Sequence, residues 1–180
     1  MKRLLLAAAL AMALTALTAC SDEAPRDLSS STPPSEPPSL TACTTQPSVA
    51  ASVTGTSDLG KKPEIEIPDT APPCGLVVGD IVPGSGAAAE TGKEIVVKYV
   101  GVTYADGKEF DASWNSGRDF PFSLGGGQVI PGWDQGIVGM KVGGRRQLTI
   151  PPDLAYGPGG RGPIPPNATL VFVVDLVKVG

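Results

Sequence analysis

The stretch Gly127-Gln128-Val129-Ile130-Pro131-Gly132-Trp133-Asp134 places two branched aliphatic side chains and a tryptophan around a proline turn. It lies in the part of the sequence that holds every aromatic residue, because all of them fall between Tyr99 and Phe172. Aromatic side chains bring the largest apolar area per residue, so a chain this poor in them has one region in which to build a core or a pocket. We therefore expect the functional domain in the C-terminal part of the chain.

Strands are predicted on both sides of this stretch. The segments indicated by apolar alternation and flanking turn residues are 64–67, 75–82, 94–104, 109–111, 120–124, 146–150 and 169–179. The dipeptide Asp106-Gly107 favours a tight turn between two of these strands. Residues 170–174 are apolar on both faces, which indicates a central strand of the sheet.

One helix is predicted, from Pro131 to about Met140. Proline is favoured in the first turn of a helix, and Trp133, Ile137 and Met140 recur on one helical face. The segment 64–67 lies between two prolines, which is typical of an edge strand. The expected fold class is α+β, with a bent antiparallel sheet of five to six strands wrapped on one short helix.

The N-terminus has the layout of a bacterial lipoprotein signal. Lys2-Arg3 is positively charged, residues 4–14 are apolar but too few to span a bilayer stably, and Leu17-Thr18-Ala19-Cys20 follows. Cleavage before Cys20 would remove residues 1–19 and leave the thiol to carry a diacylglyceryl group, which anchors the chain to the extracytoplasmic face of the membrane. The alternative is an ordinary secretory signal with an unrelated cysteine.

Residues 20–60 are rich in Ser, Thr and Pro and contain no aromatic side chain. Such a segment cannot bury enough apolar surface to offset its ordering entropy, so it is predicted to be a disordered tether. At about 3 Å per residue it could reach on the order of 100 Å from a membrane. The expected organisation is a signal peptide at 1–19, a tether at 20–60 and a folded domain at 61–180. The alternative for the tether is low complexity without a selected length.

Two cysteines remain besides Cys20. Outside the cytoplasm, Cys43 and Cys74 favour a disulfide bond with each other. The alternative is two free thiols, one of them in the tether.

Several classes of function are excluded by composition. The chain has no histidine, which removes Ser-His-Asp and Cys-His catalysis and imidazole metal sites. Its formal net charge is −4 and it has no basic run in the folded part, so we expect no nucleic-acid partner. No cofactor is expected. No metal is expected either, because the paired carboxylates Glu64/Glu66 and Asp106/Asp111 lack calcium-loop spacing.

The segment Gly157-Pro158-Gly159-Gly160-Arg161-Gly162 has the glycine spacing of a dinucleotide-binding fingerprint. That motif must open a helix, and the following Pro163-Ile164-Pro165-Pro166 cannot enter a helix interior. We interpret it as a loop.

Six blocks of sequence resemble a known family. They are Val97-Lys98-Tyr99-Val100-Gly101, Asp106-Gly107-Lys108-Glu109-Phe110-Asp111-Ala112-Ser113, Phe120-Pro121-Phe122-Ser123-Leu124-Gly125, Val129-Ile130-Pro131-Gly132-Trp133, Leu154-Ala155-Tyr156-Gly157 and Ile164-Pro165-Pro166-Asn167-Ala168-Thr169-Leu170-Val171-Phe172. In order and spacing they resemble the FKBP-type peptidyl-prolyl cis-trans isomerases over about residues 75–180. The loop between Tyr156 and Ile164 is slightly shorter than in well-known members, with Gly160 and Arg161 at its tip.

The resemblance implies an apolar pocket in which Trp133 lies under the substrate proline ring. The implied wall residues are Tyr99, Phe110, Phe120, Val129, Ile130, Ile164 and Phe172. The backbone N–H of Ile130 and the hydroxyl of Tyr156 resemble the donors to the substrate main chain, and Asp111 resembles the carboxylate at the rim. Catalysis would thus depend on Asp111, Tyr156, Ile130, Phe110 and Trp133, whereas Phe122 is interpreted as core.

The expected function is acceleration of X-Pro isomerisation during the folding of exported proteins, without covalent chemistry. The alternatives are a non-catalytic binding module that holds proline-containing segments in the same pocket, and a structural lipoprotein whose tether matters most. Expected partners are proline-containing exported polypeptides, the membrane through the lipid anchor, and macrolide immunosuppressant ligands. The chain is expected to be a monomer.

Overall fold

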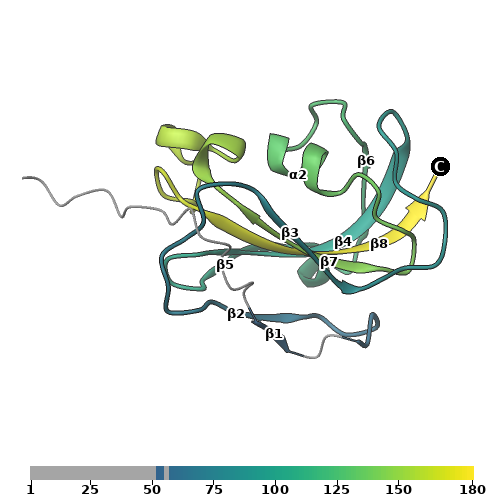
Figure 1. The fold of residues 1–180 in the computed structure, drawn as a ribbon, viewed down its shortest axis with the longest axis horizontal. Coiled ribbons are helices and arrows are strands. Elements are labelled where there is room, and N and C mark those ends of the chain that lie inside the picture. Colours follow the sequence, from purple (N-terminus) through teal and green to yellow (C-terminus); the bar gives the residue numbers. More distant parts are fainter. Residues whose placement is uncertain (1–51, 55–56) are drawn as a thin grey trace, which may run out of the picture. The chain divides into compact units, whose positions relative to one another are not determined.

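The structure is a computed structural model that describes residues 52–54 and 57–180 (Figure 1). Its main sheet is antiparallel and has six strands, in the order β3-β7-β8-β4-β5, with β6 paired to β4 as well. The strands are β3 (Val77–Val82), β4 (Glu94–Thr103), β5 (Glu109–Ala112), β6 (Phe120–Ser123), β7 (Arg145–Ile150) and β8 (Leu170–Val179). The predicted α+β fold with an antiparallel sheet of about six strands is confirmed.

The strand predicted to be central is central. β8 lies between β7 and β4, and its first seven side chains, Leu170 to Leu176, are all buried. Both faces of this strand are therefore covered, which explains why its sequence shows no polar alternation there.

Strand β4 forks the sheet. One of its edges pairs with β8 along its length, whereas the other pairs first with β6, ending at Val97 opposite Phe120, and then with β5, beginning at Val100 opposite Ala112. Between these two partners, the backbone N–H of Tyr99 donates to the hydroxyl of Ser113 over 2.9 Å. Tyr99 therefore lies where β5 and β6 diverge. A four-residue helix, α1 (Ser113–Ser116), follows β5 in this gap.

Helix α2 (Pro131–Gly136) covers one face of the sheet (Figure 1). It approaches β7 closely because two of its residues lack side chains: a Cβ on Gly136 would lie 2.6 Å from Leu148, and a Cβ on Gly132 would collide with Ile150. The helix is shorter than predicted.

The chain leaves the helical path at Gly139, which has φ +79°, and its N–H donates to the carbonyl of Ala89 over 2.8 Å. Met140 is buried in the core, but it reaches the core from this turn.

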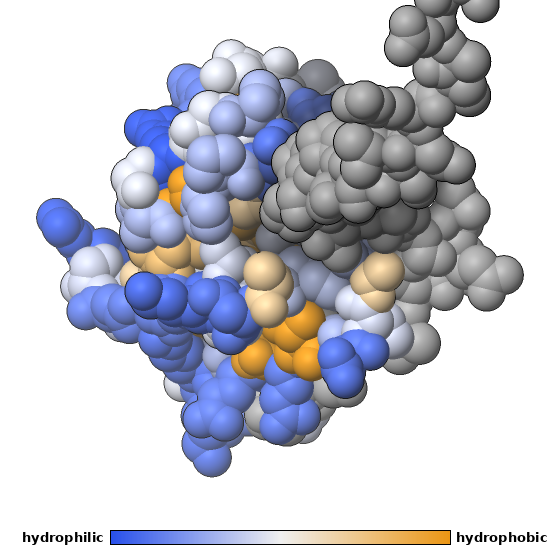
Figure 2. All heavy atoms as spheres, turned by 90° about the vertical axis from the view of Figure 1, so that its left-hand side faces the viewer, coloured by the Kyte–Doolittle hydropathy of each residue, from blue (hydrophilic) through white to orange (hydrophobic). Residues whose placement is uncertain are grey.

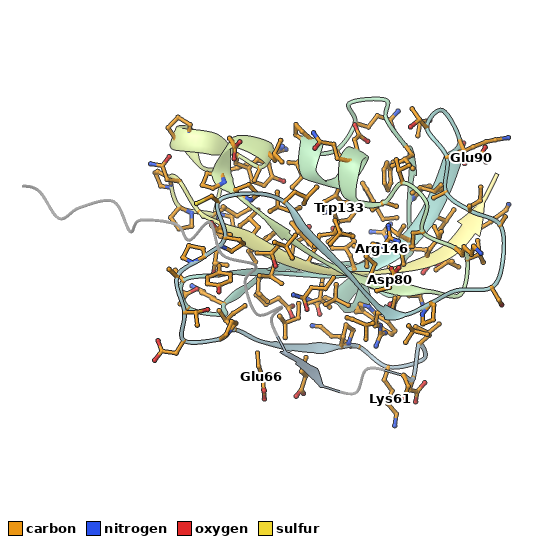
Figure 3. All side chains as sticks on the ribbon, in the orientation of Figure 1. Lys61, Glu66, Asp80, Glu90, Trp133 and Arg146 are labelled. Atoms are coloured by element: carbon orange, nitrogen blue, oxygen red, sulfur yellow. The ribbon has the colours of Figure 1, made fainter. Side chains whose placement is uncertain are left out.

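A buried arginine ties the end of α2 to the sheet. Arg146 donates from Nη1 to the carbonyls of Gly136 and Val138, at 2.9 and 3.1 Å, and from Nε to Asp80 at 2.6 Å. Figure 3 shows Arg146 and Asp80 side by side, with Trp133 on the helix side of the sheet. The carbonyls at the helix end are thus satisfied by a charged donor.

The opposite face of the sheet is covered by an N-terminal strap, residues 57–70. Ile65 and Ile67 pack against a second core cluster that includes Val100, Val102 and Val171. Strand β2 (Glu64–Glu66) pairs with β1 (Ser52–Thr54) in a separate two-stranded sheet on this side (Figure 1). On the surface shown in Figure 2, hydrophobic atoms gather in small patches among hydrophilic ones.

Strand β1 lies within the stretch predicted to be tether, so paired backbone begins before Lys61. The rest of that stretch, the predicted signal peptide and Cys20 lie outside the described residues, and their assignment stays a prediction. Cys74 is disulfide-bonded; its predicted partner, Cys43, also lies outside the described residues. In the part of the chain that the structure describes, no helix combines the length and apolarity needed to cross a membrane.

Candidate active site

An aromatic cluster surrounds Trp133 on the helix side of the sheet. Trp133 is only 3% exposed, and the rings of Tyr99 and Phe172 both lie 5.2 Å from it, edge-on at 80° and 88°. Phe120 meets it edge-on at 6.3 Å. Its indole N–H has no hydrogen-bond partner among the described residues. Trp133 is thus the buried centre of a cluster of aromatic side chains that come from four elements, β4, β6, α2 and β8.

Phe110 adds to this cluster through Phe172, since their rings lie 5.5 Å apart at 84°. Both rings pass over Gly101, where a Cβ would lie 2.6 Å from Phe172 and 2.8 Å from Phe110. This glycine is therefore needed for the two rings to meet. The sequence interpretation placed Gly101 in a family motif but did not assign it this role.

At the rim, the hydroxyl of Tyr99 donates to Oδ2 of Asp111 over 2.6 Å. Burial raises the pKa of Tyr99 far above its usual value, and the hydrogen bond to Asp111 raises it further. The tyrosine therefore stays protonated at neutral pH and keeps the carboxylate of Asp111 in one orientation.

Val129 and Ile130 come from the segment that leads into α2, and both pack against the main core. Asp134 holds this segment, because its carboxylate accepts the N–H groups of Gly125 and Gly127 at 2.8 and 3.1 Å. The carbonyl of Ile130 accepts the N–H of Trp133 at 2.9 Å, which starts the helix. The N–H of Ile130 makes no hydrogen bond within the described residues, so it is free to act as a donor.

Tyr156 and Ile164 come from the loop before β8. Two short 3₁₀ turns, η1 (Pro152–Leu154) and η2 (Gly157–Gly159), shape this loop, and neither was predicted. Ile164 is 6% exposed and belongs to the core around Trp133, against which Tyr156 packs. The guanidinium of Arg161 lies 5.6 Å from the centre of the Tyr156 ring. The interpretation of Gly157–Gly162 as a loop is confirmed.

A depression of about 690 Å³ adjoins the aromatic cluster. Four of its lining residues belong to the predicted site, namely Tyr99, Phe110, Asp111 and Phe120. The others include polar side chains of β5, α1 and the segment that leads to β6: Glu109, Asn115, Arg118 and Asp119. The site thus has an apolar part centred on Trp133 and a polar part beside it.

The structure brings all the predicted pocket residues to one side of the sheet. Seven of these predicted residues belong to the core around Trp133 or pack against it, namely Tyr99, Phe110, Val129, Ile130, Tyr156, Ile164 and Phe172. Phe120 joins them by ring contacts, and Asp111 by its bond to Tyr99. Phe122, interpreted as core, is 3% exposed. Among the described residues, no group of three or more metal-ligating side chains is gathered in one place.

Comparison with known proteins identifies the family. The family model for FKBP-type peptidyl-prolyl cis-trans isomerase matches residues 86–177. An FK506-binding protein of Streptomyces anulatus is 54% identical over 121 residues, which cover 66% of this chain and 98% of the relative. A probable FK506-binding protein of Corynebacterium glutamicum is 53% identical over 118 residues, with the same coverage of 66% and 98%.

Solved structures agree with this. AtFKBP13 superposes with a TM-score of 0.56 at 41% identity, covering 61% of this chain and 96% of that one. FkpA from Escherichia coli gives a TM-score of 0.54 at 48% identity, covering 58% of this chain and 48% of that one. The chain belongs to the FKBP-type peptidyl-prolyl cis-trans isomerases, the family that the sequence blocks predicted, and so to a family of enzymes.

Proposed function

We propose that this chain accelerates X-Pro isomerisation in exported polypeptides, by desolvation in the pocket around Trp133, while a lipid on Cys20 anchors it to the extracytoplasmic face of the membrane. The observation that best supports isomerisation in this pocket is the buried indole of Trp133, which edge-on aromatic rings enclose beside the Asp111–Tyr99 pair. The layout of residues 1–20 supports the location.

The apolar walls act on the twisted amide. Rotation about an X-Pro bond crosses a barrier of ~20 kcal/mol, because the peptide loses its resonance at the midpoint. A planar amide is strongly dipolar, whereas the twisted amide is less so and loses less when water is removed. Walls built from Phe110, Phe120 and Phe172 therefore favour the transition state over the ground state, which is the requirement for catalysis.

Polar groups at the edge of the pocket hold the substrate backbone. In this mechanism the free N–H of Ile130 and the hydroxyl of Tyr156 donate to substrate carbonyls, and Asp111 lies beside the twisting bond. Tyr99 acts as a positioning residue, because its hydroxyl orients the Asp111 carboxylate. A thousandfold acceleration requires only about 4 kcal/mol, which desolvation and one or two oriented hydrogen bonds can supply.

The same pocket is proposed to bind proline-containing segments and macrolide ligands, with the protein acting as a monomer. The support for macrolide binding is the similarity to relatives named FK506-binding protein, 54% and 53% identical to this chain.

The test is the exchange rate between cis and trans forms of a neutral X-Pro peptide, followed by NMR with and without the protein. The parent should accelerate exchange, and Phe110→Leu should reduce the acceleration, because it removes the ring that meets Phe172. Trp133→Ala is less informative, since truncation of a large core residue commonly removes 3–5 kcal/mol of stability. Peptide binding without acceleration by the parent would contradict the proposal and favour a non-catalytic binding module.

A further inference from the structure

The four arginines of the described chain fall into two pairs. Arg145 and Arg146 are buried, and each forms an ion pair, with Asp175 and Asp80 respectively. Arg118 and Arg161 form no ion pair and no side-chain hydrogen bond within the described residues. Both of these unpaired arginines lie at the candidate active site, on two different loops.

The carboxylates that line the depression, by contrast, each have a partner. Asp111 accepts the hydroxyl of Tyr99. Glu109 contacts Lys62 Nζ at 2.8 and 3.0 Å and accepts a further bond from Asn115. Asp119 lies 3.9 Å from the ammonium of Lys98. An incoming ligand therefore finds two guanidinium groups without an ion-pair partner among the described residues, whereas each of these three carboxylates already has a hydroxyl or ammonium group beside it.

The position of Arg161 is fixed by its backbone. Its N–H and carbonyl form a bridge with Ile164, at 2.9 Å each, and Ile164 belongs to the core around Trp133. The preceding Gly160 has φ +63° and no space for a Cβ, because the carbonyl of Ile164 and Pro165 occupy it. From this backbone position the guanidinium extends over Tyr156, the residue proposed to bind the substrate main chain. A guanidinium in a cation–π contact keeps N–H groups available for a carboxylate.

Arg118 lies in the polar part of the site. It lines the depression next to Phe110 and Phe120, two wall residues of the pocket. A polypeptide whose proline occupies the pocket would extend its flanking residues over these surroundings.

We propose that Arg161 and Arg118 are specificity-determining residues, which favour substrates with Asp or Glu close to the proline. The inference rests on the proposed function, since it takes the aromatic pocket as the place where proline binds. A basic residue near the proline would meet two unpaired cations and carboxylates that already have donors, so it is disfavoured. An exposed Arg–carboxylate contact changes an equilibrium by about 1.4- to 5-fold, and added salt weakens it.

The experiment uses peptides with neutral caps that differ only in Glu, Gln or Lys at one position, placed on either side of the X-Pro bond. The Glu-to-Gln ratio of kcat/KM is measured by NMR exchange, and the same ratio of affinities by NMR titration. Both ratios should be about two- to fivefold for at least one placement and should approach one at high salt. Arg161→Gln or Arg118→Gln should bring the affected ratio to one, and Arg161→Lys should restore only part of it.

Lys141→Gln is the matched control, because it removes a cation that is exposed, lies outside the site and has no ion pair within the described residues, and it should keep the parent's ratios. Equal kcat/KM for Glu and Gln peptides at every position, or a preference for Lys, overturns the inference while isomerisation itself stands. If no peptide is turned over, the proposed function fails, and the affinity ratios then decide the preference. A loss of preference in Lys141→Gln would also overturn the inference, by assigning it to overall charge.

Discussion

Tyr99→Phe removes one hydroxyl and keeps the ring that contacts Trp133. The hydroxyl is the donor in the 2.6 Å hydrogen bond to Asp111. In the proposed mechanism this bond orients the carboxylate without touching the substrate. The variant should therefore turn over X-Pro peptides more slowly, while its melting temperature falls by a few degrees at most and the protein stays folded in the assay.

The expected size of the effect follows from the surroundings of the bond. Hydrogen bonds to charged groups contribute about 1.5–3 kcal/mol, but Asp111 is exposed, so water can replace part of what Tyr99 supplies. We therefore expect a loss of about 1 kcal/mol, which is about fivefold in kcat/KM.

The assay is a double-mutant cycle with Tyr99→Phe, Asp111→Asn and the double variant, measured by peptide exchange. Asp111→Asn alone should lower kcat/KM about three- to tenfold, and adding Tyr99→Phe should cost little more, because no carboxylate remains to orient. Tyr104→Phe is the control: its hydroxyl lies 3.1 Å from Thr70 on the strap side of the sheet. Losses that multiply in the double variant, or an equal loss in Tyr104→Phe, would show that Tyr99 does not act by orienting Asp111.

Three further outcomes are expected. Tyr156→Phe should lower kcat/KM about three- to tenfold at an unchanged melting temperature, and a parent-like rate would remove its hydroxyl from the mechanism. Although burial raises the pKa of Glu109, hydrogen bonds from Lys62 and Asn115 lower it more. The contact of ionised Glu109 with Lys62 therefore stabilises the fold fully above the pKa of Glu109 in the unfolded chain, about 4.3, and this stabilisation is lost as the pH falls through the lower pKa of Glu109 in the folded state. Lys62→Met should thus lower the melting temperature at pH 7 but much less below about pH 3. An equal fall in melting temperature at pH 7 and below about pH 3 would show that the effect of Lys62 does not depend on the ionisation of Glu109. Cys20→Ala should release the protein from the membrane fraction or block signal processing, and unchanged attachment of a processed variant would exclude the lipid anchor.

The long strands could be predicted because their patterns are local. Residues 94–104 and 169–179 are continuous β-branched and apolar runs, and Asp106-Gly107 marks the turn between two neighbouring strands. The alternating segment 64–67 also gave a short strand. The family blocks predicted the pocket residues, and the structure brings most of these residues together in one core around Trp133.

Features that depend on tertiary contacts could not be predicted. The helical period through Ile137 and Met140 continued past the true end of α2, because the docking of Gly139 on Ala89 determines where the chain turns. The fork of β4 at Tyr99 depends on pairing with two separate strands. Nothing in the local sequence shows that Gly101 must leave space for two phenylalanine rings from distant strands.

The role of the strap was also hidden, because Lys62 and Glu109 are 47 positions apart and their contact exists only after folding. That Arg145 and Arg146 form ion pairs, whereas Arg118 and Arg161 form none within the described residues, is likewise visible only in the folded structure. The sequence placed Arg161 at a loop tip, but only the structure shows it over Tyr156.

If desolvation in the apolar pocket drives isomerisation, a polar group in the pocket wall should slow it, and this is tested by the kcat/KM of Val129→Thr on a neutral X-Pro peptide. This change keeps the shape of the side chain and replaces one methyl group of the pocket wall by a hydroxyl. The reference is Val177→Thr, the same change at a valine that is 41% exposed on β8. We expect a loss of about fivefold for Val129→Thr, equivalent to about 1 kcal/mol, and parent-like turnover for Val177→Thr. Equal rates for Val129→Thr and the parent would contradict isomerisation by desolvation.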